Sequence, residues 1–400
     1  MTDAGMHPVL EGVTVIDLSR FIAGPYCAAM LADFGARVIR VERPGGGEDR
    51  QLLSMEGAGD AGALFMQVNR NKESVTLDMT TPAGADIFRR LVRESDVVVQ
   101  NLPPRVLCKL GQDHESLAKI NPRIILASIT AFGSRGPKAD QLGFDGIAQA
   151  VSGAIYLGGD EAQPMKSPSS YVDFGAGVAA AFGVMAALMA REKTGRGQLV
   201  ESSLLGTALA SFSPYLIEQA VAAPNRKPQG NRSQIAAPAD LYRTRDGWII
   251  VQILGHDMFT RWTKLVGAER MATDPRFATD TLRAKNAREI GDAMSAWSSG
   301  LASADAVARL QRANIPAAEV LSPAQVIADE HVRASGLLQN VNYPGLPGDV
   351  PVVASPVVLS DTPGTVRCRP PQAGEHTDDV LRWLGYADDD VAGLRASRVV

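Results

Sequence analysis

One carboxylate stands out in the sequence because of its surroundings. Asp173, in the segment Tyr171-Val-Asp-Phe-Gly-Ala-Gly177, comes directly before the uncharged run 174–190, which is rich in alanine and glycine. The run predicts a buried helix with Asp173 as its N-cap, where a carboxylate oxygen accepts a backbone N–H of the first turn. Gly175 and Gly177 disfavour a helix, so we expect something to approach the backbone closely there. An ionised Asp173 in this position has the chemistry of a nucleophile.

Other signatures of catalysis or cofactor binding are missing from the sequence. There is no G-x-x-x-x-G-K-[ST] loop and no G-x-S-x-G elbow. The triplet Gly45-Gly46-Gly47 follows a predicted strand, but Glu48 and Asp49 come next instead of the start of a helix, so a dinucleotide fingerprint fails on context. The five histidines are scattered without metal-ligand spacing. We therefore expect no metal site.

The elements that must position Asp173 follow an alternating order. Helical patterns cover 26–34 and 82–94, and strand patterns cover 13–17, 38–42, 74–77, 96–100 and 124–129. Strands that alternate with helices predict an α/β fold with a doubly wound parallel sheet and right-handed crossovers.

The length of the chain predicts more than one domain, since 400 residues exceed the usual size of a single domain. We predict a large domain over 1–205, a linker over 206–235 with structure-breaking residues from Pro224 to Ser233, and a small α+β domain over 236–325. Residues 326–400 are expected to return to the large domain and to end in a helix near 377–384.

Charge and cysteine usage restrict the class of function. Hydrophobic residues make up 45% and charged residues 21%, and the formal net charge is −4. These values are typical of a globular chain and lack the basic surplus that nucleic-acid binding needs. Three widely spaced cysteines argue against a disulfide framework. We expect a cytoplasmic protein with no membrane or nucleic-acid partner.

The sequence resembles the family III CoA-transferases, which include formyl-CoA transferase and the carnitine and bile-acid CoA-transferases. The segments that carry the resemblance span nearly the whole chain: Val15-Ile-Asp-Leu-Ser-Arg20, Ala23-Gly-Pro-Tyr26, Leu31 to Pro44, Asn69 to Asp78, Gly143 to Ala150, Arg191-Glu-Lys-Thr-Gly-Arg-Gly197, Asp246-Gly-Trp248, Asp274-Pro-Arg-Phe277 and Gly374-Glu-His-Thr377. The resemblance implies a large Rossmann-like domain built from both ends of the chain, a small α+β domain, and an open, ring-like chain that interlocks with a second copy in a homodimer.

The resemblance also implies a reaction and a set of site residues. CoA would move from an acyl-CoA thioester to a free carboxylic acid through a mixed anhydride and an aspartyl-CoA thioester on Asp173, whose ionised form nearby helix N–H groups would favour. No cofactor would be tightly bound, since CoA itself is the substrate. The residues that match the family's CoA contacts, with cations expected on the phosphates, are Arg20, Arg43, Leu77, Asn101, Lys109 and Asp145.

Departures from the family motifs leave alternatives open. Asn101-Leu-Pro-Pro-Arg105 and Ile129-Thr-Ala-Phe-Gly133 differ from the family's usual loops. Residues 252–256 contain a single glycine, whereas a glycine-rich loop covers the site in formyl-CoA transferase, and this difference argues against oxalate or formyl specificity. The related α-methylacyl-CoA racemases need a second base, but Phe144 stands where they carry histidine, and His256 is the only substitute we identify. Racemisation and non-catalytic acyl-CoA binding remain the alternatives to transfer.

Overall fold

The computed structural model describes residues 8–400, which form two compact units. The first unit contains the residues up to Ser152 together with Ser167–Ser213 and His331–Val400. The second contains Gly153–Lys166 and Pro214–Glu330. The second unit is therefore inserted into the sequence of the first.

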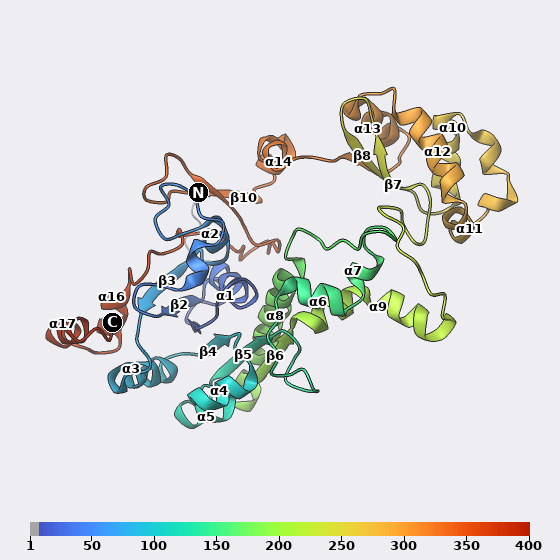
Figure 1. The fold of residues 1–400 in the computed structure, drawn as a ribbon. Coiled ribbons are helices and arrows are strands. Elements are labelled where there is room, and N and C mark those ends of the chain that lie inside the picture. Colours follow the sequence, from blue (N-terminus) through green and yellow to red (C-terminus); the bar gives the residue numbers. More distant parts are fainter. Residues whose placement is uncertain (1–7) are drawn as a thin grey trace. The chain divides into compact units, whose positions relative to one another are not determined.

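A six-stranded parallel sheet forms the centre of the first unit, in the order β3-β2-β1-β4-β5-β6 (Figure 1). Two strand series wind outward in opposite directions from the β1/β4 pair, which confirms the predicted doubly wound α/β fold. The strands are β1 (Thr14–Asp17), β2 (Arg37–Glu42), β3 (Lys72–Thr76), β4 (Val97–Gln100), β5 (Ile125–Thr130) and β6 (Leu199–Ser203).

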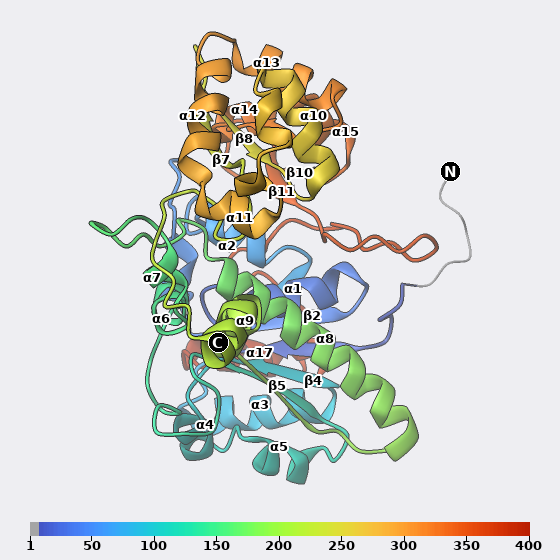
Figure 2. The ribbon, with the colours of Figure 1, turned by 90° about the vertical axis from the view of Figure 1, so that its right-hand side faces the viewer.

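Helices cover both faces of this sheet, and the strands accordingly bury both sets of alternate residues (Figure 2). Val15 and Val97 face the helices α1 (Ala23–Asp33) and α8 (Tyr171–Thr194). Ile16 and Val98 lie in the opposite core. The helices of that second layer are α3 (Pro82–Arg93), α5 (His114–Ile120), α16 (Thr377–Trp383) and α17 (Asp388–Ala396).

Helix α8 contains the predicted uncharged run. Its length and apolar composition alone would suffice to cross a membrane. In the first unit it packs along α1 and the sheet, and the side chains facing them, from Val172 to Leu188, are buried. The expected helix is confirmed, but only the face toward α1 and the sheet is buried, and the helix begins two residues before Asp173.

The chain beyond residue 204 differs from the predicted linker. Helix α9 (Leu204–Ala222) occupies the first half of 206–235, because this stretch is apolar and the structure-breaking residues begin only at Pro224. Residues 153–166, assigned to the large domain from sequence, belong to the second unit. There the N–H of Gly230 donates to the carbonyl of Gly159 at 2.6 Å.

The second unit has its own small core. Strands β7 (Ala239–Arg243), β8 (Trp248–Gln252) and β9 (Ala317–Glu319) form an antiparallel sheet. Trp262 and Phe259 fill the core beneath it. The principal helices are α10 (His256–Val266), α11 (Asp280–Lys285), α12 (Ala287–Ser298), α13 (Ser303–Arg312) and α14 (Pro323–Ala328).

The last segment of the chain completes the first unit. After a hairpin of β10 (Leu338–Val341) and β11 (Val350–Val353), the chain reaches the outer edge of β3. There the N–H of Ser74 donates to Nδ1 of His376 at 3.2 Å, and the N–H of Asp78 donates to the carbonyl of Val399 at 2.7 Å. The helix predicted near 377–384 is α16, and α17 follows it as the last helix.

A buried ion pair joins α1 to the segment that enters β3 and provides a test of this packing. Arg70 donates to both oxygens of Asp33, at 3.1 and 2.6 Å, and both side chains are fully buried. We predict that Arg70→Met lowers the free energy of unfolding by about 3 kcal/mol, because Asp33 is left as a buried, uncompensated charge.

The matched control is the double variant Asp33→Asn/Arg70→Met, which removes both charges and keeps an amide that can pair with Asn71. Its thermal unfolding midpoint should lie well above that of Arg70→Met. A double variant that is less stable than the single one would contradict this account.

Candidate active site

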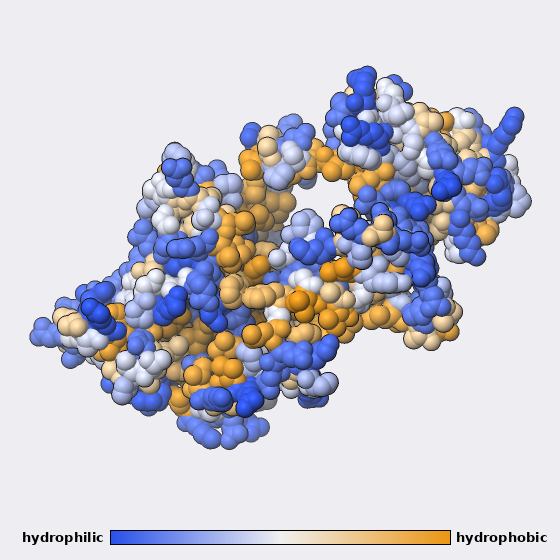
Figure 3. All heavy atoms as spheres, in the orientation of Figure 1, coloured by the Kyte–Doolittle hydropathy of each residue, from blue (hydrophilic) through white to orange (hydrophobic). Residues whose placement is uncertain are grey.

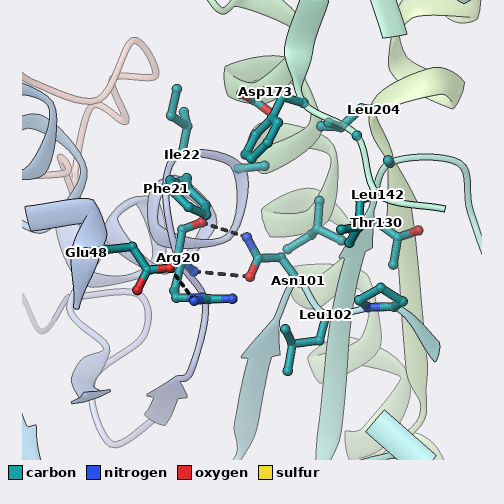
Figure 4. A pocket seen from close by; sticks show the side chains of 16 residues that line it. Arg20, Phe21, Ile22, Glu48, Asn101, Leu102, Thr130, Leu142, Asp173 and Leu204 are labelled. Carbon is teal, nitrogen blue, oxygen red and sulfur yellow. Dashed lines mark hydrogen bonds and ion pairs between the residues drawn. The ribbon is translucent and has the colours of Figure 1, made fainter. Parts of the chain in front are cut away.

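Segments at and after the ends of four strands enclose a cavity of about 300 Å³ in the first unit (Figure 4). The cavity lies at the carboxyl ends of the strands and beside the β1/β4 pair, where the strand order reverses. This is the position at which doubly wound sheets bind their ligands. The lining consists of Arg20, Phe21, Ile22 and Ala23 after β1, Glu48, Asn101 to Pro103 after β4, Ile129 to Ala131 at the end of β5, Leu142 to Phe144, Asp173 and Leu204.

The loop after β1 forms one wall and is held in an unusual conformation. Phe21 has a φ of 69°, a left-handed value that costs a residue with a side chain roughly 1–2 kcal/mol. The turn needs Gly24, because a Cβ there would lie 2.2 Å from that of Ser19. Asn101 binds the main chain of Arg20 on both sides, accepting its N–H at 3.1 Å and donating to its carbonyl at 2.6 Å. The two strand ends are thereby joined across the switch point.

A buried charge network lies beneath this loop. Lys72 donates to Asp17 at 2.7 Å, and Arg40 donates to the carbonyl of Ser19 at 3.1 Å and to both oxygens of Asp49. Asp49 in turn accepts the N–H of Phe21 at 3.1 Å. Burial lowers the pKa of Lys72 to about 8, against the opposing charge of Asp17. The network thus fixes the main chain of the strained loop from below.

Asp173 faces the cavity from the first turn of α8. It is the third residue of the helix, and the N-cap position belongs to Ser170, so the predicted N-cap role of Asp173 is wrong. The two nearby glycines are explained by the chain itself. A Cβ on Gly177 would lie 2.7 Å from the carbonyl oxygen of Ala23, and one on Gly175 would lie 2.9 Å from Thr207. The close approach expected at these glycines is that of α1 and α9.

The electrostatic environment of Asp173 favours its protonated form. The side chain is only 8% exposed, and burial raises its pKa to about 7, with the charge of Asp145 adding to the shift. The expectation that helix N–H groups would favour the ionised form is therefore wrong. The N–H groups of Val172 and Asp173 donate instead to Asp145, at 2.8 and 3.2 Å. The carboxylate of Asp173 is left accessible but poorly stabilised.

The walls around Asp173 are mainly apolar. The rings of Phe21 and Phe144 meet edge to face with centroids 5.4 Å apart, and Leu142 and Leu204 extend the apolar surface. The cation in the described lining, Arg20, lies 2.5 Å from Glu48. Across residues 8–400, no cluster of histidine, cysteine, aspartate or glutamate has the geometry to hold a metal ion. The arrangement suits a substrate with an apolar arm and a reactive carbonyl.

The structure separates the sequence-predicted site residues into two groups. Arg20 and Asn101 line the cavity together with Asp173. Arg43, Leu77, Lys109 and Asp145 do not. Arg43 and Lys109 are exposed, and Arg43 lies 3.8 Å from Glu48 at the cavity wall. Leu77 is buried in the core on the far face of the sheet, and Asp145 is buried behind Asp173.

Most of the other lining residues were missed in the sequence, among them Glu48, Phe21 and Leu142. Glu48 was noted only because it spoiled a dinucleotide motif, and its place after a strand of a parallel sheet was the available signal. Phe21 and Leu142 carried no signal, since isolated apolar residues in loops are common.

Comparison with known proteins agrees with this geometry. The sequence profile of CoA-transferase family III matches residues 10–377. The chain is 33% identical over 397 residues to the succinyl-CoA–L-malate CoA-transferase beta subunit of Chloroflexus aurantiacus, covering 98% of each chain. It is 34% identical over 393 residues to the succinate–glutarate CoA-transferase of Agrobacterium fabrum, covering 96% of this chain and 98% of that protein.

A solved structure has the same fold. The crystal structure of a CAIB/BAIF family protein from Brucella suis superposes with a TM-score of 0.83 at 30% identity, covering 95% of this chain and all of the other. Together, the match across residues 10–377 and the cavity at the switch point of the sheet show that the chain belongs to CoA-transferase family III.

Proposed function

We propose that this protein moves CoA from an acyl-CoA donor to a free carboxylic acid, with Asp173 as the covalent nucleophile. The observation that supports this most directly is the position of Asp173: its carboxylate lines a mainly apolar cavity at the switch point of the sheet. Among the described lining residues, the only other carboxylate is Glu48, which is paired with Arg20.

The proposed reaction begins at the donor thioester. A carboxylate oxygen of Asp173 attacks the thioester carbonyl, the carbon–sulfur bond breaks, and CoA leaves as a thiolate with a mixed anhydride on Asp173. The thiolate then attacks the side-chain carbonyl of Asp173. The donor acid departs as a carboxylate, and an aspartyl-CoA thioester remains.

The second half repeats this chemistry in reverse. The acceptor carboxylate attacks the aspartyl thioester and releases the CoA thiolate, which gives a second mixed anhydride. The thiolate attacks the acceptor's carbonyl in this anhydride, forming the new acyl-CoA and restoring the carboxylate of Asp173. No proton or electron is gained or lost over the cycle.

The environment of Asp173 is suited to these steps. A carboxylate whose pKa is about 7 is a stronger nucleophile than one near 4, yet a substantial fraction remains ionised at neutral pH. A bound substrate that covers the apolar walls would keep water away from the anhydride and the thioester, which water would otherwise hydrolyse.

We propose the CoA contacts from the family resemblance and from the positions of the matching residues around the cavity. Asn101 and Arg20 stand at the cavity, and Arg43 and Lys109 are exposed cations that can meet phosphate groups. Leu77 is buried in the core, so its proposed role is to support the end of β3 by packing and not to touch CoA. The relatives named above act on succinyl-CoA or on succinate and glutarate, which makes short dicarboxylic acids the first donors and acceptors to screen.

Racemisation is a weaker alternative. It needs a base on each face of the α-carbon, and Phe144, at the cavity where racemases carry histidine, cannot accept a proton. Rapid deuterium incorporation into a 2-methylacyl-CoA without transfer to any acid would favour the racemase over the transferase.

We also propose a homodimer with interlocked chains. Val178, Phe182 and Met189 lie along one face of α8 and are 39, 76 and 69% exposed. Figure 3 shows apolar surface in the region of α6 and α8. Such a continuous apolar face is typical of a surface that another chain covers.

The proposed role of Asp173 as the nucleophile can be tested by substitution and by trapping. Asp173→Asn should lower CoA transfer roughly 10³-fold or more while the protein remains folded, because the amide cannot attack the thioester. After incubation of the wild-type protein with acyl-CoA, hydroxylamine should convert Asp173 to a hydroxamate, detected by peptide mass spectrometry. Transfer at the wild-type rate by the variant, or a hydroxamate on another carboxylate, would show that Asp173 is the wrong residue.

The raised pKa of Asp173 predicts a cost in stability that depends on pH. Since burial raises the folded-state pKa of Asp173 from about 3.8 to about 7, its ionised form destabilises the fold. The penalty is absent below pH 4, grows as the pH rises, and is complete above pH 7, where it reaches up to roughly 4 kcal/mol. Asp173→Asn should therefore raise the thermal unfolding midpoint at pH 8 but leave it unchanged at pH 4. An equal or lower midpoint at pH 8 would contradict this.

The proposed homodimer predicts the mass of the protein in solution. Sedimentation at micromolar concentration should give twice the chain mass of 42.4 kDa. Phe182→Glu/Met189→Glu should shift the protein to monomer or prevent its accumulation, whereas the equally drastic Leu110→Glu, at an exposed leucine on α4 (Pro104–Leu110), should not. A wild-type monomer, or an unaltered dimer in the double variant, would refute the proposed interface.

A further inference from the structure

The first turn of α8 is capped from outside the helix. Its N-cap residue, Ser170, makes no side-chain hydrogen bond to the turn. Instead, Oδ2 of Asp145, the first residue of α6 (Asp145–Val151), accepts the N–H groups of Val172 and Asp173 at 2.8 and 3.2 Å. A carboxylate at a helix N-terminus is favourable both as an acceptor and through the helix dipole.

Asp145 is itself held by a neighbour on its own helix. The side-chain amide of Gln149 donates to Oδ1 of Asp145, and its oxygen accepts the N–H of Ser167 at 3.0 Å. Asp145 and Gln149 are 7% and 2% exposed. Both oxygens of Asp145 are therefore occupied by the protein, and neither lies in the lining of the cavity.

We propose that Asp145 and Gln149 form a clamp that positions Asp173 for attack and, through the negative charge of Asp145, makes the nearby carboxylate a stronger nucleophile. This inference rests on the proposed function, because it assigns a positioning role relative to the nucleophile. It differs from the CoA contact expected for Asp145 from sequence.

The geometry supports the positioning half of this role. Asp145 binds the main-chain N–H of Asp173 itself, so any movement of Asp145 moves the nucleophile's backbone. Gln149 binds the segment that enters α8, at Ser167. The clamp thus fixes both the entrance to the helix and its first turn. A displacement of about 1 Å at such a site can cost up to roughly 100-fold in rate.

The charges around Asp173 support the electrostatic half. Burial is the largest cause of its raised pKa, and the charge of Asp145 is the next. Burial and then Asp145 also raise the pKa of Tyr171, in the same turn of the helix. The loop after β1 presents Arg20, which is paired with Glu48, while α1 and α9 present the uncharged Ala23 and Thr207 to the next turn of α8, at Gly177 and Gly175. Asp145 is therefore the nearby charge that tunes Asp173.

The test compares a variant that removes the charge of Asp145 with a double variant that restores the hydrogen-bond pattern. Asp145→Asn removes the charge and places an amide donor against the amide of Gln149. Asp145→Asn/Gln149→Glu restores the pattern, because the introduced asparagine amide can donate to the introduced glutamate while that carboxylate still accepts the N–H of Ser167. The double variant keeps one negative charge but moves it one helical turn along α6.

We expect Asp145→Asn to reduce kcat by roughly 10-fold or more, with a much smaller change in KM for acyl-CoA. The acid limb of kcat/KM should move to lower pH by about one unit, since a carboxylate neighbour has been removed. The double variant should recover thermal stability and part of kcat, with its acid limb between those of the wild type and the single variant.

A simple structural cap would not move the pH profile. An acid limb at the wild-type pH in both variants would overturn the clamp, as would a kcat within about twofold of wild type for Asp145→Asn. If Asp145→Asn does not fold, the acid limb of the double variant decides alone: a shift to lower pH supports the clamp, and no shift overturns it. Transfer by Asp173→Asn at the wild-type rate would instead refute the proposed function, so the two failures are distinguishable.

Discussion

The buried charge network of Asp17, Lys72, Arg40 and Asp49 is the constraint on which the cavity depends. Asp17 ends the first strand, and the pairing of its carboxylate with Lys72 ties that strand end to the edge strand β3. Arg40 and Asp49 carry the connection on to the carbonyl of Ser19 and the N–H of Phe21. Burying four charges is costly unless they satisfy one another. Here they also hold a left-handed residue that would otherwise relax, and this residue forms one wall of the cavity.

The opposite wall of the cavity differs in how its charge is stabilised. On the side of the strained loop, charges are paired and satisfied; at the start of α8, Asp173 is buried beside another carboxylate, and both burial and that neighbour disfavour its ionised form. The fold gives up stability at that point and regains it in the cores on either side of the sheet. Unfavourable burial of a carboxylate in a cavity, next to satisfied networks, is typical of a site shaped for chemistry.

The sequence predicted the architecture well where the spacing of apolar residues and the local composition determine the secondary structure. Five strands and the helix pattern around them were recognised from apolar runs, because a sheet covered on both faces leaves nearly continuous hydrophobic stretches. Asp173 was recognised from its place before an uncharged helix, together with the family resemblance. The predicted start of that helix was wrong because its first turn is capped by Asp145, which is 28 residues away in sequence. A local sequence pattern cannot indicate such a distant partner. The same holds for Gly175 and Gly177, whose reason is the proximity of α1 and α9.

The discontinuous first unit has a consequence for biosynthesis. Strand β3 lies at an edge of the sheet, and its neighbours on the far side are His376, Thr377 and Val399, at least 300 residues later. During synthesis, the inserted second unit, with its compact core around Trp262, emerges in full before the first unit can close. Until Val399 leaves the ribosome, the edge of β3 and the apolar face under α16 and α17 stay open. Nascent chains of this protein therefore expose the unpaired backbone groups of an edge strand for most of their translation. We expect chaperones that bind unpaired strands to recognise them.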